Sequence, residues 1–141
     1  MLYKNTVRGI LNFKISFVIK ILILSDFLIL SAINLVSPIF AIFITDKING
    51  ATIATAGIAV MIYLIVKSVF EVPIAILIDK TKSEKDDFYT AVFGILLMAV
   101  CYFFFTRIDS IWQLYVLQGF LGLSVAISFP GWSSIFTRHI D

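Results

Sequence analysis

The chain has 141 residues, of which 60% are hydrophobic and only 14% are charged, with a formal net charge of +2. Soluble domains carry about 25% charged residues, so this composition favours a membrane protein. The single Cys101 excludes a disulfide framework and a CxxC redox site. The sequence contains no phosphate-binding loop, metal-ligand cluster or nucleic-acid patch, so we expect no cofactor, no metal and no nucleic-acid partner.

The first twenty residues form a basic segment in which four Lys and Arg residues are spread without a cleavage-site pattern. This spacing does not fit a cleaved signal peptide and predicts a cytoplasmic or interfacial segment over residues 1–20. The stretches that follow reach the ~20 apolar residues that a spanning helix needs, and they are apolar on all faces, unlike the alternating strands of a β-barrel. We therefore predict an all-α membrane protein with a four-helix transmembrane region over residues 21–137. The predicted spans are residues 21–44, 51–78, 88–106 and 111–137.

Lys and Arg gather on one side of the membrane in this arrangement. The N-terminal segment, the second loop and the C-terminal tail (residues 138–141) hold eight of the eleven, the other two loops hold two, and Lys67 lies within a span. Cytoplasmic loops are enriched in Lys and Arg, so we expect a multi-pass protein of the cell membrane with both ends in the cytoplasm. The lipid bilayer is its expected partner.

Three charged residues fall inside the predicted spans. Asp26 lies near the cytoplasmic end of the first span, and Lys67 and Glu71 are four residues apart on the second, where they share one helix face. One interpretation is a coupled cluster for proton handling or gating. The other is a neutralised Lys67–Glu71 pair that orients its helix, with Asp26 hydrated near the interface. The opposite signs of the pair favour the second interpretation, because intramembrane charge normally faces protein or water.

Other polar groups within the spans are candidates for lining a cavity. Asn34 lies near the middle of the first span and Gln118 in the outer half of the fourth, and either could instead bond a neighbouring helix. Trp132 could line a cavity or lie at the cytoplasmic interface. The small residues of the fourth span predict close helix packing. We expect no enzyme, because His139 lies at the membrane exit, after Ser133 and Ser134, and no second histidine could act as a base.

Residues 75–82, after the second span, read Ala-Ile-Leu-Ile-Asp-Lys-Thr-Lys. This segment resembles the cytoplasmic loop signature of the major facilitator superfamily, G-x-L-a-D-r-x-G-r-k. Leu77, Asp79 and Lys80 stand on its Leu, Asp and basic positions, and Ala75 replaces its first Gly. Further similar segments are Pro-Ile-Phe at 38–40, Gln-Leu-Tyr at 113–115 and Phe-Pro at 129–130. Residues 37–45 also faintly match 129–137, as the inverted repeats of this fold imply.

The resemblance implies a partial N-terminal six-helix half of a transporter that moves a small solute by alternating access. The remaining helices would then be partners in cis, the tail at 138–141 would be truncated, and the chain alone would be inactive. Asp79 would brace the cytoplasmic side, with Arg138 as its expected partner. The solute and its coupling to protons stay open. Two alternatives are a complete four-helix dimeric transporter of the small multidrug resistance type and a non-transport membrane scaffold or assembly protein.

Overall fold

The structure is a computed structural model that describes residues 16–80 and 83–139. Three parts of the sequence predictions lie outside the described residues: most of the N-terminal segment, the last two residues of the loop signature, and the last two residues of the tail. The described residues form four helices, all long and apolar enough to cross a membrane, and no strand. This confirms the predicted all-α membrane fold. The helices are α2 (Phe17–Lys47), α3 (Ile53–Lys80), α4 (Glu84–Phe105) and α5 (Ile111–Arg138).

The helices extend into segments that the sequence assigns to loops. Helix α2 begins at Phe17, inside the expected N-terminal segment, and the polar island after the second span is shared between the end of α3 and the start of α4. Acidic residues occupy the first turn of α4 and Lys80 the last turn of α3. These charges stabilise helix ends through the backbone dipole, so polar residues continue the helices beyond their apolar parts.

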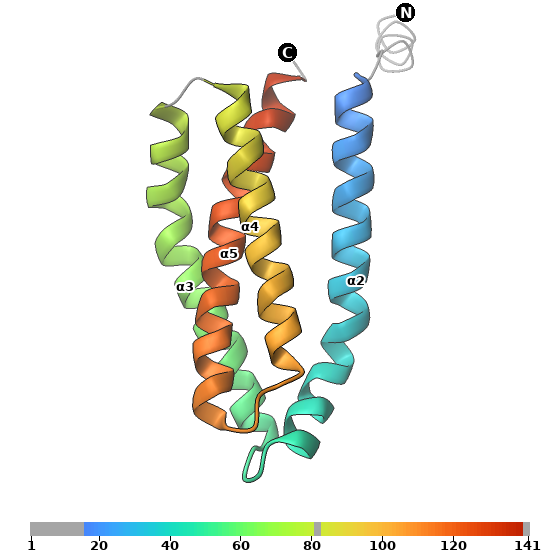
Figure 1. Cartoon of the computed structure of the whole chain (residues 1–141), viewed down its shortest axis with the longest axis vertical. Helices are drawn as coiled ribbons and strands as arrows, with labels where there is room; N and C mark the ends of the chain where they lie inside the picture. Colours follow the sequence, from blue (N-terminus) through green and yellow to red (C-terminus); the bar gives the residue numbers. More distant parts are fainter. Residues whose placement is uncertain (1–15, 81–82, 140–141) are drawn as a thin grey trace, which may run out of the picture.

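Helix α5 is the centre of the bundle. Half of its most apolar window is buried inside the protein, against 6% for α2 and for α3. Helices α3 and α4 pack along α5, whereas α2 stands apart over most of its length and approaches α3 at the end where their loop lies (Figure 1). The start of α2 and the end of α5 lie at the same end of the bundle, which we call the inner end, and the opposite end is the outer end.

Glycine brings the backbones of α3, α4 and α5 into direct contact. A Cβ added to Gly122 would lie 2.5 Å from the backbone oxygen of Tyr63 on α3, and one added to Gly131 would lie 2.6 Å from that of Asp87 on α4. At Gly94 on α4, a Cβ would lie 2.6 Å from the Cβ of Ser128. Small residues allow such close approach between membrane helices, as the sequence of the fourth span predicted. The three helices therefore form one tightly packed unit.

The outer end holds the hydrophobic core to which α2 is attached. Ile44 and Ile48, at the end of α2 and in the following turn, are almost fully buried there beside Phe105 of α4. The ring of Phe40 meets that of Phe105 edge-on at 5.9 Å between centroids. Lys47 also donates a hydrogen bond to the backbone oxygen of Thr106. Helix α2 is thus fixed at its outer end.

Candidate functional site

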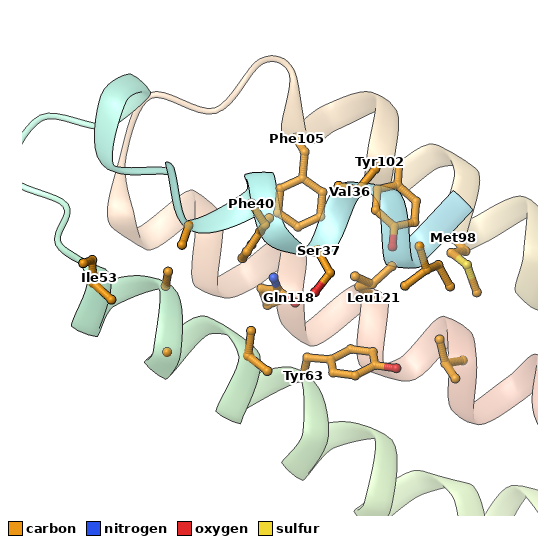
Figure 2. Close-up of a pocket in the computed structure, with 16 residues that line it drawn as sticks. Val36, Ser37, Phe40, Ile53, Tyr63, Met98, Tyr102, Phe105, Gln118 and Leu121 are labelled. Atoms are coloured by element: carbon orange, nitrogen blue, oxygen red, sulfur yellow. The ribbon is translucent and has the colours of Figure 1, made fainter. Parts of the chain in front are cut away.

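A cavity of about 390 Å³ lies in the outer half of the bundle, where α2 diverges from the other helices. All four helices contribute to its wall, as Figure 2 shows for the ten labelled residues. Its wall includes Phe40 from α2 and Met98, Tyr102 and Phe105 from α4. No Asp, Glu, Lys, Arg or His belongs to the described lining. The site is therefore an apolar and aromatic chamber without a fixed charge, open on one side, where the lining residues Val36 and Ile53 are exposed.

Four polar side chains face this chamber: Ser37, Tyr63, Tyr102 and Gln118. Gln118 is only 4% exposed, and Figure 2 shows its amide between the ribbons of the surrounding helices. Among the residues that the structure describes, none of the four side chains has a hydrogen-bond partner. The fully buried side-chain atoms without a partner in the described part of the chain are those of Asp87 and Trp132, so the Gln118 amide borders the open space of the chamber. The chamber therefore offers hydrogen-bonding capacity that the protein itself does not use.

At the inner end, Asp87 on α4 joins the end of α5. Its side chain is fully buried, and its Oδ2 lies 3.0 Å from Nη2 of Arg138 and accepts a hydrogen bond from the Ser134 hydroxyl at 2.8 Å. The other oxygen, Oδ1, is buried and finds no donor among the described residues. A buried carboxylate needs such partners to remain ionised. We call Asp87, Ser134 and Arg138 the inner clamp.

A second contact lies beside the inner clamp. Nε2 of His139 lies 3.6 Å from Oε1 of Glu84, and Nδ1 lies 3.0 Å from the backbone oxygen of Ile135. Because a carbonyl only accepts, Nδ1 carries the proton in this arrangement. Helices α4 and α5 are thus linked at two neighbouring places.

Of the three intramembrane charges, the structure brings two together. Nζ of Lys67 lies 3.9 Å from Oε2 of Glu71, and it also lies 5.6 Å from the ring centroid of Phe129 on α5. Asp26 is half-buried on α2, and no described ion pair joins it to either residue. The structure thus brings Lys67 and Glu71 together without Asp26, and the role of the pair stays a prediction. The inner part of α2, which carries Asp26, stands apart from α3 (Figure 1).

The other two candidates for cavity lining lie elsewhere. Asn34 is exposed, and its amide donates to the backbone oxygen of Leu30 at 2.8 Å, within its own helix. Trp132 is stacked between Phe129 and Phe136, at centroid distances of 6.3 and 5.1 Å. Its buried Nε1 has no hydrogen-bond partner among the described residues. Of the three candidates, only Gln118 lines the chamber described above.

A family model described as Major Facilitator Superfamily matches residues 22–141. The chain belongs to the major facilitator superfamily. The match covers all four helices except the first residues of α2. Searches of curated proteins and of solved structures gave no match. Membership in this superfamily supports a role in transport across a membrane, not in enzymatic catalysis.

The described part of the loop signature, residues 75–80, lies on the last turns of α3. Leu77 is 63% exposed, Asp79 and Lys80 are exposed, and Ala75 is half-buried. The expected pairing of Asp79 with Arg138 does not occur: the described ion pair of Arg138 is with Asp87. The physical reason is that α4 packs closely on the inner part of α5 through Gly131, which brings Asp87 to Arg138.

Sequence analysis missed Asp87, Tyr63 and Tyr102. Asp87 stands in a run of charged residues that predicts a solvated loop, and hydropathy offers no signal that separates it from Asp86. The two tyrosines lie in apolar stretches, where a hydroxyl is the available signal of a polar contact. That signal does not tell whether the hydroxyl faces a cavity, a helix or lipid.

Proposed function

We propose that this chain takes part in the transmembrane transport of a small solute by alternating access, as the N-terminal portion of a transporter half. The observation that carries the proposal is the family match over residues 22–141, together with an uncharged chamber walled by all four helices. Ligand sites in helical membrane proteins lie between helices, and a concave apolar site with a few convergent polar groups is the expected form of a binding site.

The packing of the helices suits a moving part. The glycine contacts and the inner clamp hold α4 and α5 together, whereas α2 is fixed at its outer end and stands apart along its inner part. Rigid bodies that move about a limited attachment are the usual elements of alternating access. In this proposal α3, α4 and α5 move as one body, and the position of α2 changes the size of the chamber between them.

The proposal includes an orientation and a dependence on further helices. Both ends of the chain face the cytoplasm, which places the inner clamp at the cytoplasmic surface and the chamber in the outer half of the membrane. Four helices form one wall of a path, and a transporter of this family uses two halves of six. The 141-residue chain by itself is therefore expected to conduct no solute.

Transport is tested with membrane vesicles from cells that carry the gene in its genomic setting and from cells in which it is deleted. A panel of labelled small solutes is offered to both, and we expect at least one solute whose accumulation depends on the gene. Liposomes that contain only the purified 141-residue chain are expected to show no flux of that solute. Flux through the chain alone would contradict the dependence on other helices and would favour the dimeric four-helix alternative. No gene-dependent flux of any solute would argue against transport.

A further inference from the structure

We propose that the chamber between α2, α3, α4 and α5 binds an uncharged aromatic solute that carries one hydrogen-bonding group, and that Gln118 recognises this group. As a statement about substrate class, the inference rests on the transport function proposed above. As a statement about binding, it concerns only this chamber and can be tested without any flux measurement.

The first argument comes from the hydrogen bonds that the chamber lacks. The side chain of Gln118 is only 4% exposed, and its amide has no hydrogen-bond partner among the described residues. The hydroxyl of Tyr102 extends into the same space, as Figure 2 shows, and is also unpartnered in the described part of the chain. Because buried polar groups in native proteins are nearly always satisfied, an occupant with a donor and an acceptor fits here.

The second argument concerns charge. An ionised ligand in an apolar chamber loses its hydration and needs an opposite charge in compensation. The described lining contains no ionisable group other than two tyrosine hydroxyls, whose ordinary pKa of about 10 keeps them neutral near pH 7. Anionic and cationic solutes are therefore disfavoured, and a neutral solute is accepted.

The third argument concerns size and shape. A volume of about 390 Å³ lies within the range of roughly 300–1,000 Å³ that small-molecule sites occupy. The rings of Phe40 and Phe105 form an edge-on pair in the wall, and Tyr102 lies 6.1 Å from Phe105 between centroids. Such a wall offers faces and edges on which another ring can pack. A lipid acyl chain could fill the space, but it would leave the Gln118 amide without a partner.

Three compounds with one ring system separate these arguments. 1-Naphthamide is neutral and carries a carboxamide, 1-naphthoate has the same shape and a negative charge, and 1-methylnaphthalene has no polar group. Binding of each to the purified 141-residue chain in lipid nanodiscs is measured by calorimetric titration, with empty nanodiscs as the blank for partition into lipid. We expect saturable binding of 1-naphthamide at one site. 1-Methylnaphthalene and 1-naphthoate should each bind at least about tenfold more weakly, the factor that corresponds to one good hydrogen bond or more.

Two variants test the recognition by Gln118. Gln118→Leu keeps the size of the side chain and removes the amide, so it should weaken 1-naphthamide about tenfold and leave 1-methylnaphthalene within about twofold. Asn34→Leu is the matched control, because the Asn34 amide bonds within its own helix outside the chamber. It should leave both affinities unchanged. Tyr102→Phe keeps the ring and removes the hydroxyl. It tests independently whether a second polar group of the chamber wall contributes to the affinity for 1-naphthamide.

The thermal unfolding of the ligand-free variants distinguishes recognition from a structural role. Removing an amide that has no partner should leave the midpoint of Gln118→Leu unchanged or raise it. The proposal is overturned if the three compounds bind equally, if none binds, or if Gln118→Leu and Tyr102→Phe both retain full affinity for 1-naphthamide. If binding behaves as expected and the vesicle experiment finds no flux, the chamber is a binding site and the transport function fails. If gene-dependent flux occurs without binding here, the substrate site lies elsewhere.

Discussion

Asp87→Asn should destabilise the helix bundle by weakening the inner clamp. The change keeps the shape of the side chain and removes the charge that faces Arg138 across 3.0 Å. Removing one partner of a fully buried pair costs about 3–5 kcal/mol, but the Arg138 side chain is 36% exposed and can be hydrated when the Asp87 charge is removed. Hydrogen bonds to charged groups contribute about 1.5–3 kcal/mol. We therefore expect a loss of about 2 kcal/mol in the free energy of unfolding.

The contribution of the pair is isolated by a double-mutant cycle. Asp87→Asn, Arg138→Gln and the double variant are unfolded with dodecyl sulfate in mixed micelles, and helix content is followed by circular dichroism. The coupling energy between the two positions should exceed about 1 kcal/mol, because the residues are in direct contact. Asp86→Asn is the matched control: Asp86 is the preceding residue, is exposed, and should change stability by less than about 0.5 kcal/mol. A coupling energy below about 0.5 kcal/mol would refute the clamp.

Three further outcomes follow from the packing and the charges. Gly122→Ala places a Cβ 2.5 Å from a backbone oxygen of α3 and should destabilise the bundle by about 1–3 kcal/mol. The control Gly119→Ala meets no atom within 4 Å and should be neutral or stabilising. Equal effects of the two variants in the same unfolding assay would be incompatible with the described contact. Lys67→Met should lower stability or membrane insertion, because it leaves the charge of Glu71 unpaired. Adding Glu71→Gln should restore most of the loss. Additive losses would show that the two side chains do not neutralise each other's charge. Ser110→Cys lies in the loop between α4 and α5, which faces outward in the proposed orientation, so it should react with an impermeant maleimide added to intact cells. The native Cys101 is buried and should contribute little labelling. Labelling only after lysis would reverse the proposed orientation.

The four helices were predictable because length and hydropathy are properties of single segments. Each apolar run is long enough to cross the bilayer, and backbone hydrogen bonding allows little other than a helix in that setting. The Lys67–Glu71 contact was predictable for a similar reason, since a spacing of four residues places two side chains on one helix face. These features need no knowledge of how the helices are arranged around one another.

The contacts between helices were harder to predict from the sequence. The sequence gives the depth of a residue in the membrane but not the direction in which its side chain points around the helix axis. Asp79 and Asp87 have similar depths, and packing at Gly131 decides that Asp87 meets Arg138. Gln118 and Asn34 were equivalent candidates, yet one faces the chamber and the other bonds its own helix. Ile33 and Ser37 of α2 line the chamber on either side of Asn34, so the helix face on which Asn34 lies, and not its depth, keeps it out.

The chamber and the inner clamp occupy different parts of the bundle, and this separation has a mechanical consequence. The clamp joins α4 to α5 at the inner end, whereas the chamber depends on the distance of α2 from α5 farther out. Helix α2 can therefore move relative to Gln118 without breaking the bond between Asp87 and Arg138. A solute that touches both Val36 on α2 and Gln118 on α5 favours the arrangement in which these helices are closer, because a ligand shifts an equilibrium toward the state in which it gains more contacts. Binding in the chamber would then be transmitted through α2, while the other three helices keep their packing.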